Sequence, residues 1–476
     1  MVENFSFLSA IILLPFMGML FTLFSREDVD NVSHNAFNVA IFTICANLVL
    51  VLRVLSNMNL QKDGLQLVER FNWLENPNID IILGADIFSI VTIMTVHFAF
   101  LIGMYGMREQ AHLKAMMIFS LLLLGILSGY FLAADIFSFC IFFEAMLFPL
   151  FMLIGMFGNI RRDGMIYRFF LYNFFGAVIL FLAIVMLFNL HDGFLEISKY
   201  GTLKHNSSLG IWVLLFIFIA FLSRIPIWPF HYWISSISAN IRSPLVFIVT
   251  NLLPLTGIYG FMRFLPNQFH SSLVFGIIVL EIIAIITMLF IALIGFINKD
   301  IQYKLFSYTT VYYIIYLLAL LNGNNMTKMN IAFSCFSFII IISVLEILSS
   351  YLHYEQEHKG INSDGILCPA PKLSFVYSFF ILAAMGLPVS SLFVNNFLIV
   401  SQLIEKSINM GLIVVASLTL SAGALLKDYY RLKDRSKVSP DKPCISDISP
   451  YQYWFNFAIM LVLLYSSLKP LWFLGA

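Results

Sequence analysis

Glu144 is a carboxylate inside an otherwise apolar run of residues, 142–149. A charge at bilayer depth costs several kcal/mol, so it is kept mainly where it faces a polar interior and carries ions or protons. Arg224 stands at the end of a second apolar run, and His231 follows it. A carboxylate, a cation and an imidazole are groups that hold or pass protons. These residues therefore predict ion or proton transfer within a membrane.

Each of these residues also has a structural explanation. Glu144 fits a carboxylate that is hydrogen-bonded to a neighbouring helix, and Arg224 fits a side chain that snorkels to the membrane edge. His231 follows two prolines, where packing or capping is as natural as proton transfer. Asp135 stands at the start of the fifth span. It fits the N-terminal residue of a helix as well as it fits a group that takes part in proton transfer. Two further acids, Glu281 and Glu346, also lie in apolar runs, and the sequence does not identify which residues they contact.

The composition indicates what must position these groups. The chain is 60% hydrophobic and 11% charged, with 50 phenylalanines in 476 residues and a mean hydropathy of +0.91. These values exclude a water-soluble globule and predict an all-α, polytopic membrane protein, with residues 1–476 as a single membrane domain. About fourteen stretches approach the ~20 residues that a spanning helix needs. They are 5–24, 36–54, 83–104, 115–132, 135–157, 167–190, 209–230, 245–264, 273–296, 305–321, 329–352, 373–398, 412–430 and 453–473.

The remaining segments are short. Residues 58–80 mix charges with aromatic side chains such as Trp73, which indicates an extracytoplasmic loop or an interfacial helix. The first span lacks a basic leader and a small-residue cleavage site, so we expect it to be retained. Lys and Arg concentrate in the loops on the side of the first loop, which predicts that both termini are extracytoplasmic. Five cysteines show no CxxC spacing, so metal or iron–sulfur ligation is not expected.

Two spans contain residues that interrupt helices. The seventh contains Pro226 and Pro229, and the twelfth contains the string Gly386-Leu387-Pro388. Proline removes a backbone donor and clashes with the preceding turn, so we expect both helices to break. Matching breaks favour two inverted five-helix repeats, 115–264 and 273–430, with ion sites at the breaks.

Five strings in the chain agree in order and spacing with one known family. They are FFEAMLFP at 142–149, FFLY at 169–172, RIPIWPFHYW at 224–233, GIYGFMRF at 257–264 and GLP at 386–388. On these strings, which extend from about the third to the thirteenth span, the chain resembles the antiporter-like membrane subunits of respiratory complex I.

The resemblance implies a fourteen-helix fold with two inverted five-helix repeats, embedded beside sister antiporter-like subunits in the membrane arm. It implies proton translocation coupled to electron transfer, as one subunit of an NADH:quinone oxidoreductase. Quinone, FMN and iron–sulfur clusters would lie elsewhere in the complex, with none bound by this chain. The partners would be other membrane subunits and the lipid bilayer, with no nucleic acid. The location would be the inner membrane of a bacterium or, alternatively, of a mitochondrion.

In that family a glutamate in the fifth span pairs with a lysine in the seventh. Glu144 matches the glutamate, and Arg224 takes the place of the lysine, with His231 in the same string. Arginine stays charged at any physiological pH, whereas a buried lysine can lose its proton. Arg224 is therefore expected to pair with Glu144 without shuttling a proton.

Other positions depart from the family pattern as well. Leu255, Tyr313 and Asn396 replace a lysine, a histidine and a glutamate, Gln302 replaces another lysine, and residues 234–238 lack the usual acid and histidine. A subunit with impaired pumping is one consequence of these changes, and a non-pumping structural paralogue is another. A subunit of a multisubunit cation/proton antiporter, which has the same fold, is the remaining alternative.

Overall fold

The structure is a computed structural model, and it describes most of the chain. The described residues are 6–26, 34–59, 64–74, 79–107, 112–157, 162–191, 197, 208–240, 243–265, 271–323, 325–359, 365–388, 390–434 and 447–468. Within them, eleven helical stretches are long and apolar enough to cross a membrane. Each of the expected spans overlaps one helix or a pair of short helices. The helical membrane fold is confirmed, and the number of fourteen crossings stays a prediction.

The chain divides into two compact units. The first contains residues Met1–Ile241 and Val249–Ile282, and the second contains Arg242–Ile248 and Ile283–Ala476. The expected repeats, 115–264 and 273–430, stay a prediction, as does their inverted relation. The orientation of the termini also stays a prediction, because several of the basic residues behind it lie outside the described residues.

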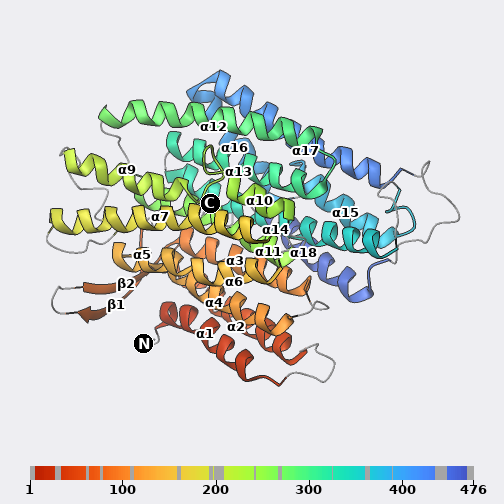
Figure 1. The fold of residues 1–476 in the computed structure, drawn as a ribbon, viewed down its shortest axis with the longest axis horizontal. Helices are drawn as coiled ribbons and strands as arrows, with labels where there is room; N and C mark the ends of the chain where they lie inside the picture. The colour runs from red at the N-terminus through yellow and green to blue at the C-terminus, as the bar shows by residue number, and fades with distance from the viewer. Residues whose placement is uncertain are drawn as a thin grey trace. The chain divides into compact units, whose positions relative to one another are not determined.

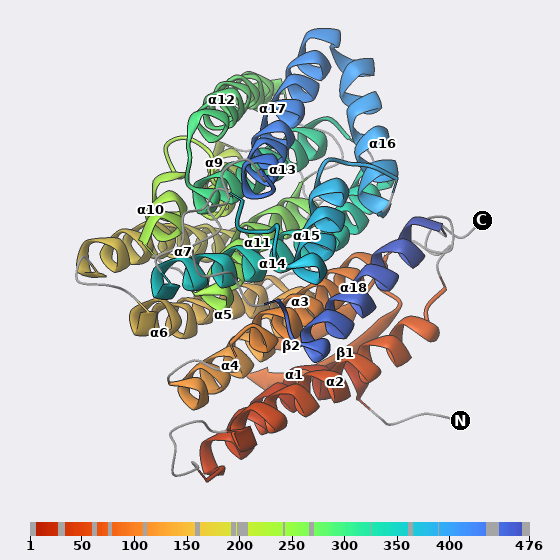
Figure 2. The same ribbon diagram turned by 90° about the vertical axis from the view of Figure 1, so that its right-hand side faces the viewer.

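The elements of the first unit are α1 (Phe7–Phe24), α2 (His34–Ser56), β1 (Leu67–Leu74), β2 (Ile79–Ala85), α3 (Ile87–Tyr105), α4 (Leu113–Leu132), α5 (Ile136–Ala145), α6 (Leu147–Phe157), α7 (Arg162–His191), α9 (Ser208–Leu222), α10 (Tyr232–Asn240) and the greater part of α11 (Pro244–Phe264). Helix α4 is apolar on all sides and packs against α1, α2, α3, α5 and α6 (Figure 2). A helix without a polar face is stable only when it is surrounded, so α4 forms the core of this unit.

A β-hairpin occupies most of the segment between α2 and α3 (Figure 1). Strands β1 and β2 pair antiparallel from Leu67↔Ala85 to Leu74↔Ile79. The interfacial helix that the sequence allowed at residues 58–80 is therefore wrong. Aromatic residues alternate with polar ones in Phe71-Asn72-Trp73, which suits the two faces of a strand better than one face of a helix. The hairpin also includes residues 83–85, so the third membrane helix begins later than expected.

Two carboxylates join the hairpin to the helices. The Glu69 carboxylate of β1 accepts hydrogen bonds from the backbone N–H groups of Leu8 (2.8 Å) and Ser9 (3.0 Å), at the start of α1. The Asp135 carboxylate accepts from the N–H of Ile82 in β2 (2.8 Å) and caps α5 by accepting from the N–H of Ser138 (2.7 Å). Helix N-termini have unpaired donors that such acids satisfy. The reading of Asp135 as a helix N-terminal residue is confirmed.

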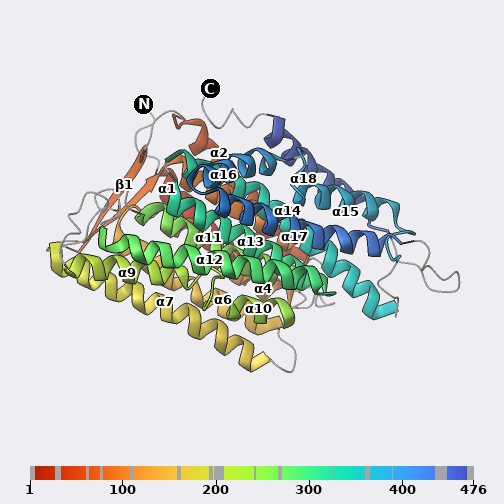
Figure 3. The same ribbon diagram turned by 90° about the horizontal axis from the view of Figure 1, so that it is seen from above.

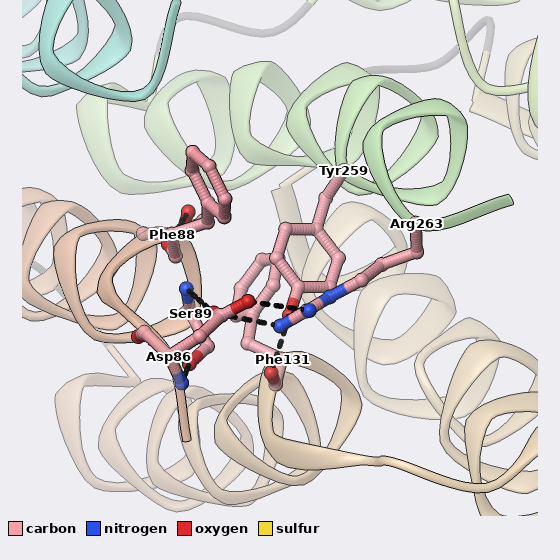
Figure 4. A network of polar contacts seen from close by, with 7 residues as sticks. Asp86, Phe88, Ser89, Phe131, Tyr259 and Arg263 are labelled. Atoms are coloured by element: carbon pink, nitrogen blue, oxygen red, sulfur yellow. Dashed lines mark hydrogen bonds and ion pairs between the residues drawn. The ribbon is translucent and has the colours of Figure 1, made fainter. Parts of the chain in front are cut away.

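A buried ion pair connects α3 with α11 in the first unit (Figure 4). Arg263 donates to both carboxylate oxygens of Asp86, at 2.6 and 2.8 Å, and also to the hydroxyl of Tyr259. Tyr259 in turn donates to the carbonyl of Phe131 at the end of α4 (2.6 Å). Asp86 caps α3 by accepting from the N–H of Ser89. One arginine therefore fixes the ends of three helices.

The elements of the second unit are α13 (Ile301–Asn322), α14 (Asn325–Lys359), α15 (Pro371–Ala384), α16 (Ser391–Lys406), α17 (Ile408–Leu432), α18 (Pro450–Leu468) and the later part of α12 (Ser271–Ile297). Helices α13 and α14 are almost entirely buried, whereas most of the α17 surface is not. Helix α13 packs against α14, α16 and α17 (Figure 3). The lipid-facing surface is thus left to the outer helices.

Both predicted helix breaks are present. Residues 223–231 between α9 and α10 are not helical, and α15 is separated from α16 by a turn at Gly386. Gly386 has a φ of +77°, a conformation that only glycine adopts without strain. Pro388 then prevents α15 from continuing. Val389, in the same string, lies outside the described residues.

We expect Arg263→Met to lower the free energy of unfolding by roughly 3 kcal/mol, because it leaves the Asp86 carboxylate buried without its cation. The side chains of Arg263 and Asp86 are 15% and 6% exposed, so water replaces little of the lost interaction. Thermal unfolding in detergent would measure the loss, with Arg53→Met at an exposed position of α2 as the matched control. Equal stability of the two variants would contradict a stabilising role for the pair.

Candidate functional site

Arg224 lies in the first turn of the break that follows α9. Its N–H still donates to the carbonyl of Phe221 (3.1 Å), after which Pro226 and Pro229 supply no donors. The side chain is fully buried, although it carries a charge. The interpretation that Arg224 snorkels to the membrane edge is therefore wrong. Its guanidinium ends inside the first unit and does not reach the surface.

The Arg224 guanidinium is held by uncharged groups on α5 and at its end. Nη2 donates to the carbonyl oxygen of Phe143 (2.8 Å), and the group lies 3.9 Å from the centre of the Phe143 ring. Nη1 lies 3.9 Å from the sulfur of Met146, and Nε has no hydrogen-bond partner among the described residues. A carbonyl and an aromatic face both attract a cation. The charge is thus stabilised without a contacting carboxylate among the described residues.

Glu144 points elsewhere. Its side chain is exposed at the surface of this chain. Its Oε1 lies 3.7 Å from the thiol sulfur of Cys140, one turn earlier on α5. Within the described residues no salt bridge joins it to Arg224, although the two charges interact at longer range. The expected contact pair is therefore not formed in this structure. The two groups are neighbours because Arg224 binds the residue that precedes Glu144.

The fifth span has a small irregularity at this point. Helix α5 ends at Ala145 and α6 begins at Leu147, but Met146 between them keeps helical backbone angles, and its N–H donates to the carbonyl of Phe142 (3.4 Å). The side chain of Met146 is the one that contacts Arg224. Met146 of the fifth span thus lies against the break in the seventh span. Pro149, three residues after Met146, removes a donor from the first turn of α6 and is the sequence signal for the irregularity.

Gly257 of α11 allows the broken segment to approach closely. A Cβ at this position would lie 2.8 Å from the carbonyl oxygen of Phe221 and 3.2 Å from the Cβ of Arg224. Both distances are shorter than ordinary contacts, and the first involves backbone that cannot rotate away. The first glycine of the GIYG string therefore has a packing role: it brings α11 against the segment that carries Arg224.

His231 stands at the end of the same break. It is partly buried, and within the described residues its Nδ1 has no hydrogen-bond partner. No hydrogen bond in the described part of the chain connects it to Glu144 or Arg224. Helix α10 begins at the next residue, so His231 occupies the cap position there. His231 thus makes no direct hydrogen bond to the other two predicted site residues in the described structure.

The second break has an uncharged polar network beside it. The amide nitrogen of Asn396 donates to the hydroxyl of Tyr312 (2.9 Å), and its oxygen accepts from Ser334 (3.3 Å). The Ser334 hydroxyl is also hydrogen-bonded to Tyr316 (2.8 Å). These groups can order water, but none of them is ionised at neutral pH. The remaining predicted positions, Leu255, Tyr313, Glu281 and Glu346, are all buried.

The sequence analysis missed a second buried ion pair. Lys304 at the start of α13 is 2.7 Å from Asp428 near the end of α17, with side chains 3% and 1% exposed. Lys304 was expected in the loop just before the tenth span, whereas Asp428 lay within the expected span 412–430. Asp428 is flanked by Lys427 and Arg431, so it does not stand out in the sequence as an isolated charge in an apolar run. A partner 124 residues away cannot be named from one sequence.

These geometries define what the described residues can do chemically. In the first unit a fixed cation lies near a titratable carboxylate, and in the second unit a titratable lysine contacts a carboxylate. Such groups can hold and move protons or respond to a neighbouring charge. No group of three His, Cys, Asp or Glu side chains in the described part of the chain is arranged to hold a metal ion.

The sequence matches a known protein family and named proteins of that family. Residues 133–422 match the family model described as NADH:quinone oxidoreductase/Mrp antiporter, TM. The chain is 26% identical to NADH-quinone oxidoreductase subunit M from Rickettsia bellii, over 97% of this chain and 95% of that protein.

Two solved structures share the fold. A chain of respiratory complex I from Thermus thermophilus has a TM-score of 0.85 at 20% identity, covering 98% of this chain and 96% of that one. A chain of the Mrp complex from Dietzia sp. DQ12-45-1b has a TM-score of 0.77 at 14% identity, covering 96% of this chain and 50% of that one. Because the family model matches more than half of the residues, the chain belongs to the NADH:quinone oxidoreductase/Mrp antiporter transmembrane family.

Proposed function

We propose that this protein is a membrane-arm subunit of a proton-translocating NADH:quinone oxidoreductase, similar to subunit M, and that it contributes to proton translocation. The observation that carries the proposal is the family match across both broken helices, together with a buried cation at the first break beside the helix of Glu144. The similarity to subunit M extends over nearly the full length of both chains. The partners would be the other membrane subunits and the lipid of a bacterial inner membrane.

The chain would be enzymatic only as part of the complex. Electron transfer from NADH to quinone would take place on other subunits, which would hold FMN, the iron–sulfur clusters and quinone. This chain would supply polar groups within the bilayer. Its transport role would be to change the protonation of those groups when the complex is reduced.

Within the first unit, we assign Glu144 the role of proton carrier and Arg224 the role of a fixed charge. Glu144 is the ionisable group of the pair, because arginine does not release its proton. Arg224 keeps a constant positive field near the carboxylate, which favours its ionised form. Movement of Glu144 toward or away from Arg224 would then favour release or uptake of the proton. The exposed face of Glu144 is where a neighbouring membrane subunit would cover it.

The alternative function is a subunit of a multisubunit cation/proton antiporter. It is favoured by the family description, which includes both classes, and by the fold shared with the Mrp complex. Against it, this chain covers half of the Mrp chain and nearly all of the complex I chain.

Purification of the tagged protein from its native membrane separates these functions. We expect flavin- and iron–sulfur-containing subunits to copurify, and the eluate to reduce quinone with NADH. Copurification with only small membrane subunits, together with cation-dependent proton exchange in vesicles, would contradict the complex I assignment. Recovery of the complex without any proton transport would support a structural paralogue.

We expect Glu144→Gln to lower the number of protons moved per NADH oxidised, because the amide keeps the shape of the side chain and cannot titrate. Proteoliposomes containing the purified complex, with a pH-sensitive dye inside, would measure this ratio. Glu405→Gln, which removes the same charge from an exposed site on α16, is the control and should keep the wild-type ratio. A wild-type ratio for Glu144→Gln would rule out its role as a carrier.

We expect Arg224→Lys to raise the same ratio, because a buried lysine can give up its proton. It should also reduce stability by about 1 kcal/mol, since the planar contact with the Phe143 ring is lost. The control is Arg53→Lys on α2, where the arginine is exposed. If the ratio stays unchanged in an assembled complex, then Arg224 is not the residue that limits transport.

A further inference from the structure

A polar cavity at one end of the second unit has no role in the function described so far. Its volume is about 330 Å³, and its wall includes Lys299, Ser349, His353, Tyr377, Asp428 and Arg431. A water molecule occupies roughly 30 Å³ of liquid, so the cavity has room for several waters. Its charged and hydroxyl groups give such waters hydrogen-bond partners. The cavity is therefore suited to water rather than to an apolar ligand.

Asp428 in the wall of this cavity holds an unusual position. Its Oδ1 contacts two cations, Lys304 at 2.7 Å and Arg431 at 2.9 Å. Its Oδ2 has no hydrogen-bond partner among the described residues, although the side chain is only 1% exposed. A buried carboxylate oxygen without a partner is costly. Water in the adjoining cavity is the partner that its position allows.

Lys304 is the chemically important member of the pair. It is buried, and its ammonium contacts Asp428. Desolvation penalties make a buried ion pair a weak source of stability compared with apolar packing, so stability alone does not explain its presence. Unlike Arg224 in the first unit, Lys304 can lose its proton.

A further acid continues inward from the cavity. Glu346 precedes the cavity residue Ser349 by one turn of α14, and the Ser349 hydroxyl donates to the Glu346 carbonyl oxygen (2.9 Å). Glu346 is fully buried, and its carboxylate interacts electrostatically with Tyr377, as do Asp428 and Arg431. The other charged or titratable groups around the cavity are Lys299, Asp300 and His353. Ionisable groups thus extend from the cavity into the core of the second unit.

We propose that this cavity is a proton entry site of the second unit, with Asp428 and Lys304 as its proton-loading pair. The proposal rests on the proton-translocating function proposed above. A hydrated proton in the cavity binds Oδ2 of Asp428, which forms an O–H bond there and leaves neutral water. Lys304 can then pass a proton inward, toward Glu346, and regain one from Asp428. No net bond is made or broken apart from these proton transfers.

Thiol labelling tests whether the cavity contains water. We expect Ser349→Cys to react with a membrane-impermeant maleimide in the assembled complex, because this residue lines the cavity. The matched control is Ser343→Cys on the same helix: both serines are 1% exposed, but Ser343 lies outside the cavity wall. Both would be compared with the wild-type chain and its own cysteines. Failure of Ser349→Cys to react, or equal reaction of the two variants, would overturn the proposal.

Proton-to-NADH ratios in proteoliposomes test the pair itself. We expect Asp428→Asn and Lys304→Arg to lower the ratio, even though Lys304→Arg keeps a positive charge beside the carboxylate. A purely structural pair would tolerate Lys304→Arg and keep the wild-type ratio, which would overturn the proposal. Glu144→Gln is measured in parallel. If it alone lowers the ratio, the proton entry site fails and the proposed function stands; if the wild-type complex moves no protons, the proposed function fails first.

Discussion

The structure depends on one physical constraint: a charge inside the bilayer must be stabilised by the protein, because no bulk water is present to do so. Arg224 illustrates it in the first unit. The broken end of α9 places the guanidinium against the Phe143 carbonyl and ring, and Gly257 lets α11 pack closely against the backbone that carries Arg224. The breaks in the helices therefore create the polar backbone environment that a buried cation needs.

The two units meet this constraint with different chemistry. At the helix break in the first unit the cation is Arg224, and the carboxylate of Glu144 is not in contact with it. In the second unit Lys304 contacts Asp428 directly beside a cavity of about 330 Å³. An arginine can set an electric field but cannot carry a proton, whereas a lysine can do both. If this chain moves protons, the titratable groups are distributed unequally between its units.

The sequence was sufficient for the fold class and for the positions of the breaks, because hydropathy and proline have local physical effects. It was insufficient for the hairpin of β1 and β2, since a short segment with mixed polarity fits a strand or an interfacial helix almost equally well. For the charged side chains, too, the sequence shows which residues are unusual but not which residues they contact. Glu144 and Arg224 stand out within apolar runs, but only the tertiary structure shows that Arg224 binds the carbonyl of Phe143 rather than the Glu144 carboxylate. The partner of Lys304 lies on another helix, so only the tertiary structure identifies Asp428.

The most direct test is the number of protons translocated per NADH oxidised by the purified complex in proteoliposomes, with the wild-type chain and with the double variant Glu144→Gln/Asp428→Asn. Glu144 is the proposed proton carrier of the first unit, and Asp428 is the proposed entry carboxylate of the second. We expect an assembled complex with the double variant to have a lower ratio than a complex with either single variant. A wild-type ratio for the double variant would contradict the claim that this chain carries protons.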